Sequence, residues 1–120
     1  MDVSKSAGNA VSAVVVESDF HQRVDAILSS IEGAMDTAEC DIDAELNGGI
    51  LTLTFANTSK VIVNRQTPMR EIWIAAKSGG FHFKFDGAAW RDTRSHEQIE
   101  TLLSRVVSEQ SENVFTFKFT

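Results

Sequence analysis

The chain has 120 residues, enough for one domain, and 42% of them are hydrophobic and 23% charged, a composition typical of a globular protein and not of a disordered or fibrous one. Its 17 acidic and 11 basic residues give a formal net charge of -6, which argues against a protein that binds nucleic acid by neutralising phosphates. Residues 1–60 carry ten acids and three bases, whereas residues 61–120 carry seven acids and eight bases. The acidic N-terminal half therefore favours a cation or a basic protein as partner.

The N-terminal segment and the single cysteine bear on where the protein works. Cys40 is the only cysteine, which excludes an intramolecular disulfide and a thiolate metal cage. The longest early apolar run, residues 13–16, is too short for a membrane span or a secretory signal. We expect a cytoplasmic protein with no membrane partner, in which residues 1–17 form a flexible tail outside a domain of residues 18–120.

A helical period follows and predicts a helix over residues 18–36. Ser18 is the predicted N-cap, and Asp19 is favourable in the first turn. Apolar residues recur at intervals of three and four and form one stripe: Phe20, Val24, Ile27, Leu28, Ile31 and Met35. A second stripe is expected to face water: His21, Asp25, Ser29, Glu32 and Asp36.

The pattern then changes to the period of two that is typical of strands. Residues 41–46 alternate strictly, so that Ile42, Ala44 and Leu46 are predicted to face the core. Asn47-Gly48 is a strong hairpin signal. Further strands are predicted at residues 50–55, 60–65, 71–76 and 81–85 and around Trp90.

The C-terminal part predicts a second helix and an extended end. Residues 95–98, Ser-His-Glu-Gln, have the form of a capping box, and the helix after them has an inner stripe of Ile99, Leu102, Leu103 and Val106. Phe115, Phe117 and Phe119 are predicted to close the chain as an extended segment. This order of elements predicts an α+β fold, a two-layer α/β sandwich with two helices packed on one face of a mostly antiparallel sheet.

Clustered acids are the first candidate for function. Six of them fall within fourteen residues: Glu32, Asp36, Glu39, Asp41, Asp43 and Glu45. Carboxylate oxygens suit hard cations, and without a rigid loop such sites would be weak and exchangeable. The alternative is a solvated face that keeps the protein soluble. His21 and Asp25, four residues apart, could reach one ion, or they could form a helix-cap or solvent-exposed pair.

Trp73 is the second candidate, because alternation with Ile72 and Ile74 places it on the face away from the core. With Asn64, Arg65 and Gln66 nearby it predicts a protein-docking surface, unless the C-terminal segment covers it. Catalytic residues are not evident, because the sequence has no phosphate loop, zinc spacing or nucleophile elbow. Cys40 lies near carboxylates, which raise the pKa of a thiol rather than activate it.

Several separated motifs together resemble the frataxin family. They occur in this order: Asp41-Ile42-Asp43, the run from Asn47 to Phe55, Asn64-Arg65-Gln66, Ile72-Trp73-Ile74-Ala75 and Gly79-Gly80-Phe81-His82-Phe83. The likeness runs from about Asp19 to the C-terminus and leaves residues 1–17 outside it. It implies two helices against a mostly antiparallel sheet, which agrees with the order of elements predicted from the residues.

The resemblance also implies weak, exchangeable binding of ferrous or ferric iron at an acidic ridge. In this sequence the acidic ridge corresponds to Asp19, His21, Asp25, Glu32, Asp36, Asp41, Asp43 and Glu45. It implies a role in iron–sulfur cluster assembly through contact with the cysteine desulfurase and the scaffold protein. The partner-binding residues would be Glu32, Asp36, Asn64, Arg65, Gln66 and Trp73.

Three hypotheses follow. The first is a non-enzymatic regulator that binds the desulfurase through the acidic ridge and the Trp73 face. The second is an iron chaperone or weak ferroxidase that delivers or detoxifies ferrous iron. The third is a sheet that binds single-stranded nucleic acid through Trp73, Arg65, Arg70 and Lys77, which the net charge disfavours. We expect a monomer and leave iron-driven oligomers open.

Overall fold

The computed structural model describes residues 2–38 and 41–119, with side chains from Glu17 onward. Two residues considered in the sequence analysis lie outside the described residues: Glu39, a member of the acidic cluster, and Cys40, the single cysteine. The elements follow in this order: α1 (Asp2–Thr37), β1 (Ile42–Asn47), β2 (Ile50–Phe55), β3 (Lys60–Gln66), β4 (Glu71–Ala76), β5 (Gly79–Phe85), β6 (Trp90–Asp92) and α2 (Ile99–Ser111).

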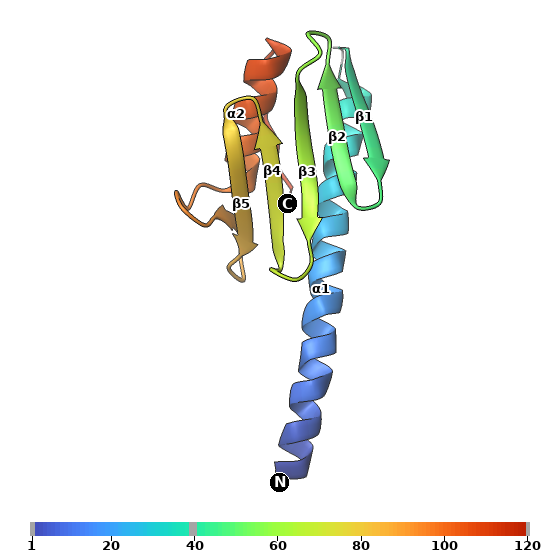
Figure 1. Cartoon of the computed structure of the whole chain (residues 1–120), viewed down its shortest axis with the longest axis vertical. Helices are drawn as coiled ribbons and strands as arrows, with labels where there is room; N and C mark the ends of the chain where they lie inside the picture. Colours follow the sequence, from blue (N-terminus) through green and yellow to red (C-terminus); the bar gives the residue numbers. More distant parts are fainter. Residues whose placement is uncertain (1, 39–40, 120) are drawn as a thin grey trace.

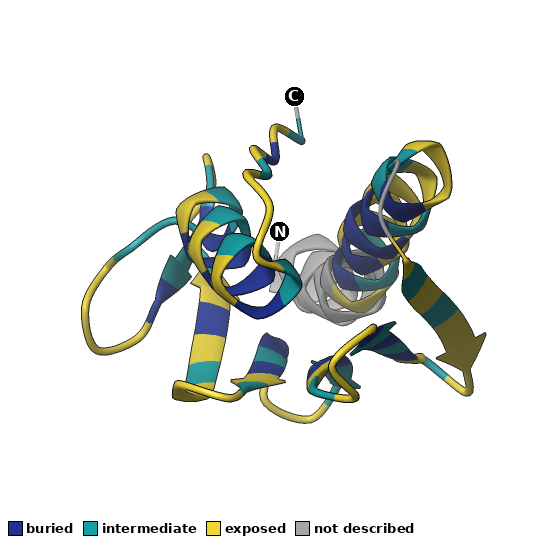
Figure 2. Cartoon of the chain, turned by 90° about the horizontal axis from the view of Figure 1, so that it is seen from above, coloured by how far each residue is buried: buried dark blue, intermediate teal, exposed yellow. Residues whose placement is uncertain are grey.

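The six strands form one antiparallel sheet in the order β1-β2-β3-β4-β5-β6, so that each strand pairs with its neighbour in sequence (Figure 1). Figure 2 shows both helices on the same side of this sheet. The predicted two-layer α+β sandwich is therefore confirmed. Within the described residues, no helix is long and apolar enough to cross a membrane.

α1 begins earlier than the sequence pattern predicts. The helix is continuous from Asp2, and the predicted N-cap at Ser18 is wrong, because a serine caps a helix only where the preceding backbone leaves the helix. No proline lies between residues 2 and 18 to force that exit. The division of the chain at residue 17 stays a prediction.

The alternation of the strands separates a covered face from an open face. On β2, Leu51, Leu53 and Phe55 are buried beneath the helices, whereas Thr52 and Thr54 are only partly buried. Leu46 corrects the prediction for β1, because its side chain is 46% exposed. It lies next to the hairpin turn, in which Gly48 and Gly49 both have positive φ, of 60° and 83°, the backbone that a two-residue type I′ turn requires.

The hydrophobic core lies between the two layers. The predicted apolar stripe of α1 is buried throughout, as is the inner stripe of α2. Sheet residues complete the core from the other side: Leu51, Leu53, Phe55, Val61, Val63, Ile72, Ile74, Phe83 and Trp90.

α2 starts at Ile99 and not after Ser95. Gln98 occupies the N-cap position and makes no side-chain cap hydrogen bond. The Ser95 hydroxyl instead accepts the backbone N–H of Glu97, at 3.2 Å, and His96 has a φ of 64°. The predicted capping box is therefore wrong, because Ser95 closes a local turn before the helix.

The turn between β5 and β6 is fixed by Asp86. The backbone N–H groups of Ala89 and Ala88 donate to its carboxylate, at 2.8 and 2.9 Å, and Arg91 Nε donates at 2.9 Å. These contacts lower the pKa of Asp86 from 3.8 to about 2. The stability that this carboxylate contributes is therefore present above pH 3.8 and is lost as the pH falls through about 2. The turn holds Phe85 and Trp90 opposite each other in register.

The C-terminal segment packs between the helices as an extended chain (Figure 2). Phe117 is 5% exposed, and Phe115 and Phe119 pack against the core. The backbone N–H groups of Phe115 and Phe117 donate to the hydroxyls of Ser108 and Ser104 on α2, each at 2.8 Å. The segment is therefore part of the domain.

Phe117→Ala is expected to lower the free energy of unfolding by about 3 kcal/mol, because it removes a buried ring and leaves a cavity. Urea unfolding followed by circular dichroism measures this change. The neighbouring exposed residue provides the control, since Thr116→Ala should alter the stability by less than about 0.5 kcal/mol. Equal stability of the Phe117→Ala variant and the unsubstituted protein would contradict the packing described.

Candidate functional site

Most acidic residues singled out from the sequence lie where α1 meets β1, an edge strand of the sheet. Asp36, Asp41, Asp43 and Glu45 are exposed, and Glu32 is partly buried. Among the described residues, none of these five has a basic side chain within ion-pair distance. We call them the α1–β1 carboxylates: Glu32, Asp36, Asp41, Asp43 and Glu45.

His21 and Asp25 are held by Arg65 of β3. Arg65 Nη1 donates to His21 Nδ1 at 2.8 Å, and Arg65 Nη2 forms an ion pair with an Asp25 carboxylate oxygen. His21 Nε2 lies 4.0 Å from a Glu17 oxygen. The two predicted metal ligands share one face of α1 and both remain partly open to solvent, but the Arg65 guanidinium already contacts both of them.

Arg65 therefore does not lie where the sequence analysis placed it. It precedes Gln66 and follows Asn64 on one strand, so alternation sends its side chain to the opposite face. Arg65 pairs in register with the buried Ile72, and its side chain is 18% exposed. The expectation that Arg65 joins Trp73 on one docking surface is wrong, as is the grouping of the two for single-stranded nucleic acid.

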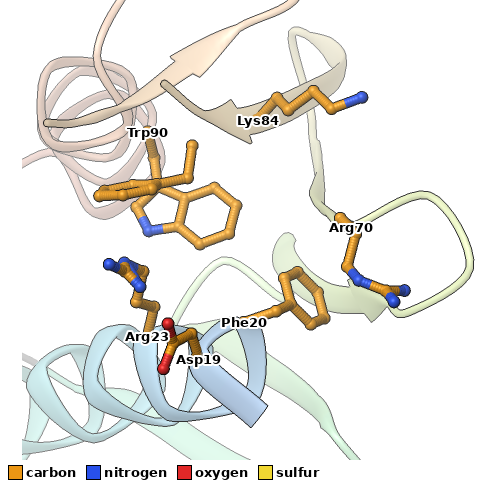
Figure 3. A pocket seen from close by; sticks show the side chains of 7 residues that line it. Asp19, Phe20, Arg23, Arg70, Lys84 and Trp90 are labelled. Atoms are coloured by element: carbon orange, nitrogen blue, oxygen red, sulfur yellow. The ribbon is translucent and has the colours of Figure 1, made fainter. Parts of the chain in front are cut away.

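Asp19 is separated from the rest of the acidic ridge. It is six residues before Asp25, which places the two about 120° apart around a helix of 100° per residue. Asp19 lines a pocket together with Phe20, Arg23, Arg70 and Trp90 (Figure 3). The acidic ridge implied by the resemblance is thus divided between two sides of α1.

The described residues bring no three histidine, cysteine, aspartate or glutamate side chains together into a group that could hold a metal ion. The carboxylate oxygens present have the hard-donor chemistry that ferrous and ferric iron accept. The described residues are therefore suited to weak binding of an ion by one or two carboxylates, and not to a site in which three or more side chains enclose the metal.

Trp73 lies on the open face of the sheet, as predicted. Its indole ring stacks on the imidazole of His82, with ring centroids 4.2 Å apart and planes 8° apart. Its Nε1 donates to Glu71 Oε1 at 2.8 Å. The C-terminal segment does not cover this residue, because it packs between the helices on the other face (Figure 2).

Asn64 and Gln66 share the open face with Trp73. Asn64 is the direct cross-strand partner of Trp73, and Gln66 is that of Glu71. Both amide side chains are partly exposed. The open face thus presents a fixed aromatic ring flanked by amides, a combination suited to protein contact.

Sequence reasoning missed Glu71 and His82 as parts of this surface. Glu71 is buried, and its Oε1 lies 3.9 Å from His82 Nδ1. The alternation of His82 with Phe81 and Phe83 assigns it to the open face, but its position opposite Trp73 depends on the register of β4 with β5. The bond from Trp73 to Glu71 depends on side-chain conformation, which the pattern does not contain.

Comparisons with known proteins agree with this architecture. A family model described as a frataxin-like domain matches residues 13–113. The chain is 48% identical over 98 residues to the iron-sulfur cluster assembly protein CyaY of Burkholderia mallei (strain SAVP1), covering 79% of this chain and 91% of the relative.

Two solved structures are also similar. Frataxin from Psychromonas ingrahamii superposes with a TM-score of 0.77 at 36% identity, over 87% of this chain and 97% of that chain. Trimeric frataxin from Saccharomyces cerevisiae, complexed with ferrous iron, has a TM-score of 0.64 at 25% identity, over 78% of this chain and 86% of that chain.

Arg65→Met is expected to increase the affinity of the His21–Asp25 pair for a divalent cation several-fold, because it removes the competing guanidinium. A titration with Co²⁺, followed by the NMR signals of the His21 ring, measures the change. Arg91→Met is the control, since it removes a similar ion pair, with Asp86, in another part of the fold. An unchanged midpoint in a folded Arg65→Met protein would show that Arg65 does not compete with the ion.

Proposed function

The chain belongs to the frataxin family, and we propose that it acts in iron–sulfur cluster assembly, as an iron-binding accessory protein that regulates the complex of cysteine desulfurase and scaffold protein. The observation that carries this proposal is the set of α1–β1 carboxylates, which have no basic partner among the described residues. Unpaired surface charges of one sign attract a basic patch on another protein and accelerate encounter.

The Trp73 face is the second contact surface in this proposal. Trp73 is stacked on His82 and bonded to Glu71, so little side-chain entropy is lost when a partner packs on it. Asn64 and Gln66 offer amide donors and acceptors beside the ring. The open face and the α1–β1 carboxylates meet at β1, since Asp43 and Glu45 alternate with the inward-packed Ala44. One partner, or two adjoining partners, could contact both surfaces.

Iron enters this proposal as cargo and not as a resident cofactor. The α1–β1 carboxylates supply oxygen ligands, and the ferrous complex of the yeast relative supports iron as the metal. Since no three described ligands converge, we propose that binding is weak and exchangeable. The protein would work in the cytoplasm, as a monomer at low iron.

A second candidate is an iron chaperone or weak ferroxidase, which the ferrous complex of the yeast relative favours. Oxidation of ferrous iron is helped by ligands that hold the ion in a fixed geometry during the change of charge. The surface carboxylates of this chain are spread over a helix and a strand. We therefore propose that the protein is not an enzyme.

Charge reversal at Glu32, Asp36 and Asp43 to lysine is expected to weaken desulfurase binding roughly tenfold or more at low salt, chiefly through slower association. Surface plasmon resonance at two salt concentrations measures this, and the difference should shrink at high salt. The control is charge reversal at Glu100 and Glu109 of α2 and at Glu112, its C-cap residue. This variant changes the net charge by the same amount at a different part of the surface. Unchanged binding of the first variant would overturn the role of the α1–β1 carboxylates.

The rate of ferrous oxidation by oxygen tests the non-enzymatic proposal. We expect the initial rate, followed by ferrozine, to be the same with the protein as with an equal concentration of serum albumin. The Asp36→Asn and Asp43→Asn double variant should give that rate too. A rate that rises in proportion to the protein and falls in the variant would instead establish the ferroxidase.

A further inference from the structure

A pocket on the other side of α1 from the α1–β1 carboxylates has the opposite charge. It lies between the middle of α1, the β3–β4 turn and the β5–β6 hairpin, and its volume is about 240 Å³ (Figure 3). Its lining combines aromatic rings, three basic side chains and one acid: Phe20, Phe85, Trp90, Arg23, Arg70, Lys84 and Asp19.

The floor of the pocket is a fixed group of rings. Phe20 meets Trp90 edge to face, with centroids 6.1 Å apart, and Phe85 meets Trp90 at 5.6 Å. Phe20 and Trp90 are 6% and 5% exposed. Because these rings also belong to the core, the floor keeps its shape when the pocket is empty.

The arginines stand at opposite ends of this floor (Figure 3). The Arg23 guanidinium lies 4.3 Å from the centre of the Phe85 ring, which restricts its position. Arg70 Nη1 donates to the Thr67 carbonyl at 2.7 Å, and the backbone of Arg70 has a φ of 55°. A left-handed backbone is unfavourable for a residue with a Cβ, so the turn holds Arg70 in place at some cost in stability.

The charges of the pocket are only partly neutralised. Arg70 Nη2 is 4.0 Å from a Glu17 oxygen, and among the described side chains neither Arg23 nor Lys84 has a carboxylate within ion-pair distance. The basic side chains outnumber the single acid in the lining, Asp19. The pocket is thus positive in a protein whose net charge is -6.

We propose that this pocket binds a small organic anion, a carboxylate or phosphate attached to one ring-sized apolar body. The apolar body would lie on Phe20 and Trp90, and the acid group would pair with the guanidinium of Arg23 or Arg70, whose planar forks match carboxylate and phosphate oxygens. The volume is below the range typical of sites for drug-sized ligands, roughly 300–1,000 Å³, which limits the ligand to about one ring. This site does not depend on the proposed role in cluster assembly.

Phenyl phosphate, benzoate, benzyl alcohol and inorganic phosphate are the probes, each titrated into the ¹⁵N-labelled chain of 120 residues. The two aryl anions should shift the Trp90 indole N–H signal and the amides of Phe20 and Phe85, and leave the Trp73 indole unchanged. Comparison of the two aryl anions distinguishes phosphate from carboxylate ligands. Benzyl alcohol and inorganic phosphate should each bind at least tenfold more weakly, because each lacks one half of the ligand.

Variants locate the anion within the pocket. Arg23→Gln and Arg70→Gln should each lower the affinity for the preferred aryl anion, by roughly tenfold for the arginine that pairs with it. Asp19→Asn should raise this affinity several-fold, because it removes the repulsion between two negative charges. Arg105→Gln is the matched control, because Arg105 is also a helix arginine over a phenylalanine ring, at 5.8 Å from Phe81, and it should bind like the unsubstituted protein.

Three outcomes would overturn the proposal. The first is no shift of the Trp90 signal with either aryl anion. The second is an affinity for benzyl alcohol equal to that for the aryl anions. The third is an equal loss of affinity for the aryl anion in Arg105→Gln and Arg23→Gln. Since Arg23 is exposed, its variant should keep the dispersed spectrum of the folded protein. If Arg70→Gln does not fold, Arg23→Gln and Asp19→Asn still decide the question.

Discussion

Burial of only one face of the β-sheet is the constraint on which the rest of the molecule depends. Two helices and the C-terminal segment pack on the side of that face, so most of the alternate side chains along the strands belong to the core or pack against it. The side chains between them are left for other purposes. Neighbours in sequence therefore lie on opposite faces of the sheet. Trp73 lies on the open face while Ile72 and Ile74 are buried. Asn64 lies on the open face while Arg65 contacts α1.

α1 divides the charged groups in the same way, with a period of 3.6 residues instead of two. Its buried stripe rests on the sheet, so two flanks remain. The flank toward β1 carries Glu32 and Asp36, and the flank toward β6 carries Arg23. Glu17 lies between the two systems, 4.0 Å from both His21 and Arg70. A protein with a negative net charge can thereby present a negative surface and a positive pocket at once.

The sequence was most informative where period and burial agree. The strands at residues 50–55 and 71–76 were predicted with their observed bounds, because strict alternation is bounded by clear turns. Both inner helix stripes were predicted because apolar residues at intervals of three and four fall on one side of a helix, and that side is buried. Leu46 was misplaced because alternation assigns a face but not the extent of the covering helix.

Functional side chains were harder to predict. Asn64, Arg65 and Gln66 are adjacent in sequence, and their separation onto two faces follows only once β3 is known to continue through Gln66. A capping pattern alone does not show where a helix begins. The backbone is already helical before Ser18, whereas after Ser95 it makes a turn and becomes helical only at Ile99. The pocket at Trp90 could not be foreseen, because its lining residues come from α1, the β3–β4 turn and the β5–β6 hairpin, whose juxtaposition is tertiary.

The position of β1 at the edge of the sheet has a further consequence, for solubility. An edge strand exposes backbone donors and acceptors to which another chain can add a strand, and charged side chains are a common defence against such aggregation. On β1, Asp43 and Glu45 are exposed on either side of Ala44. Carboxylates suited to recognition thus also repel a second copy of the same edge. Neutral substitutions at these positions would therefore impair colloidal behaviour while the fold itself remained stable.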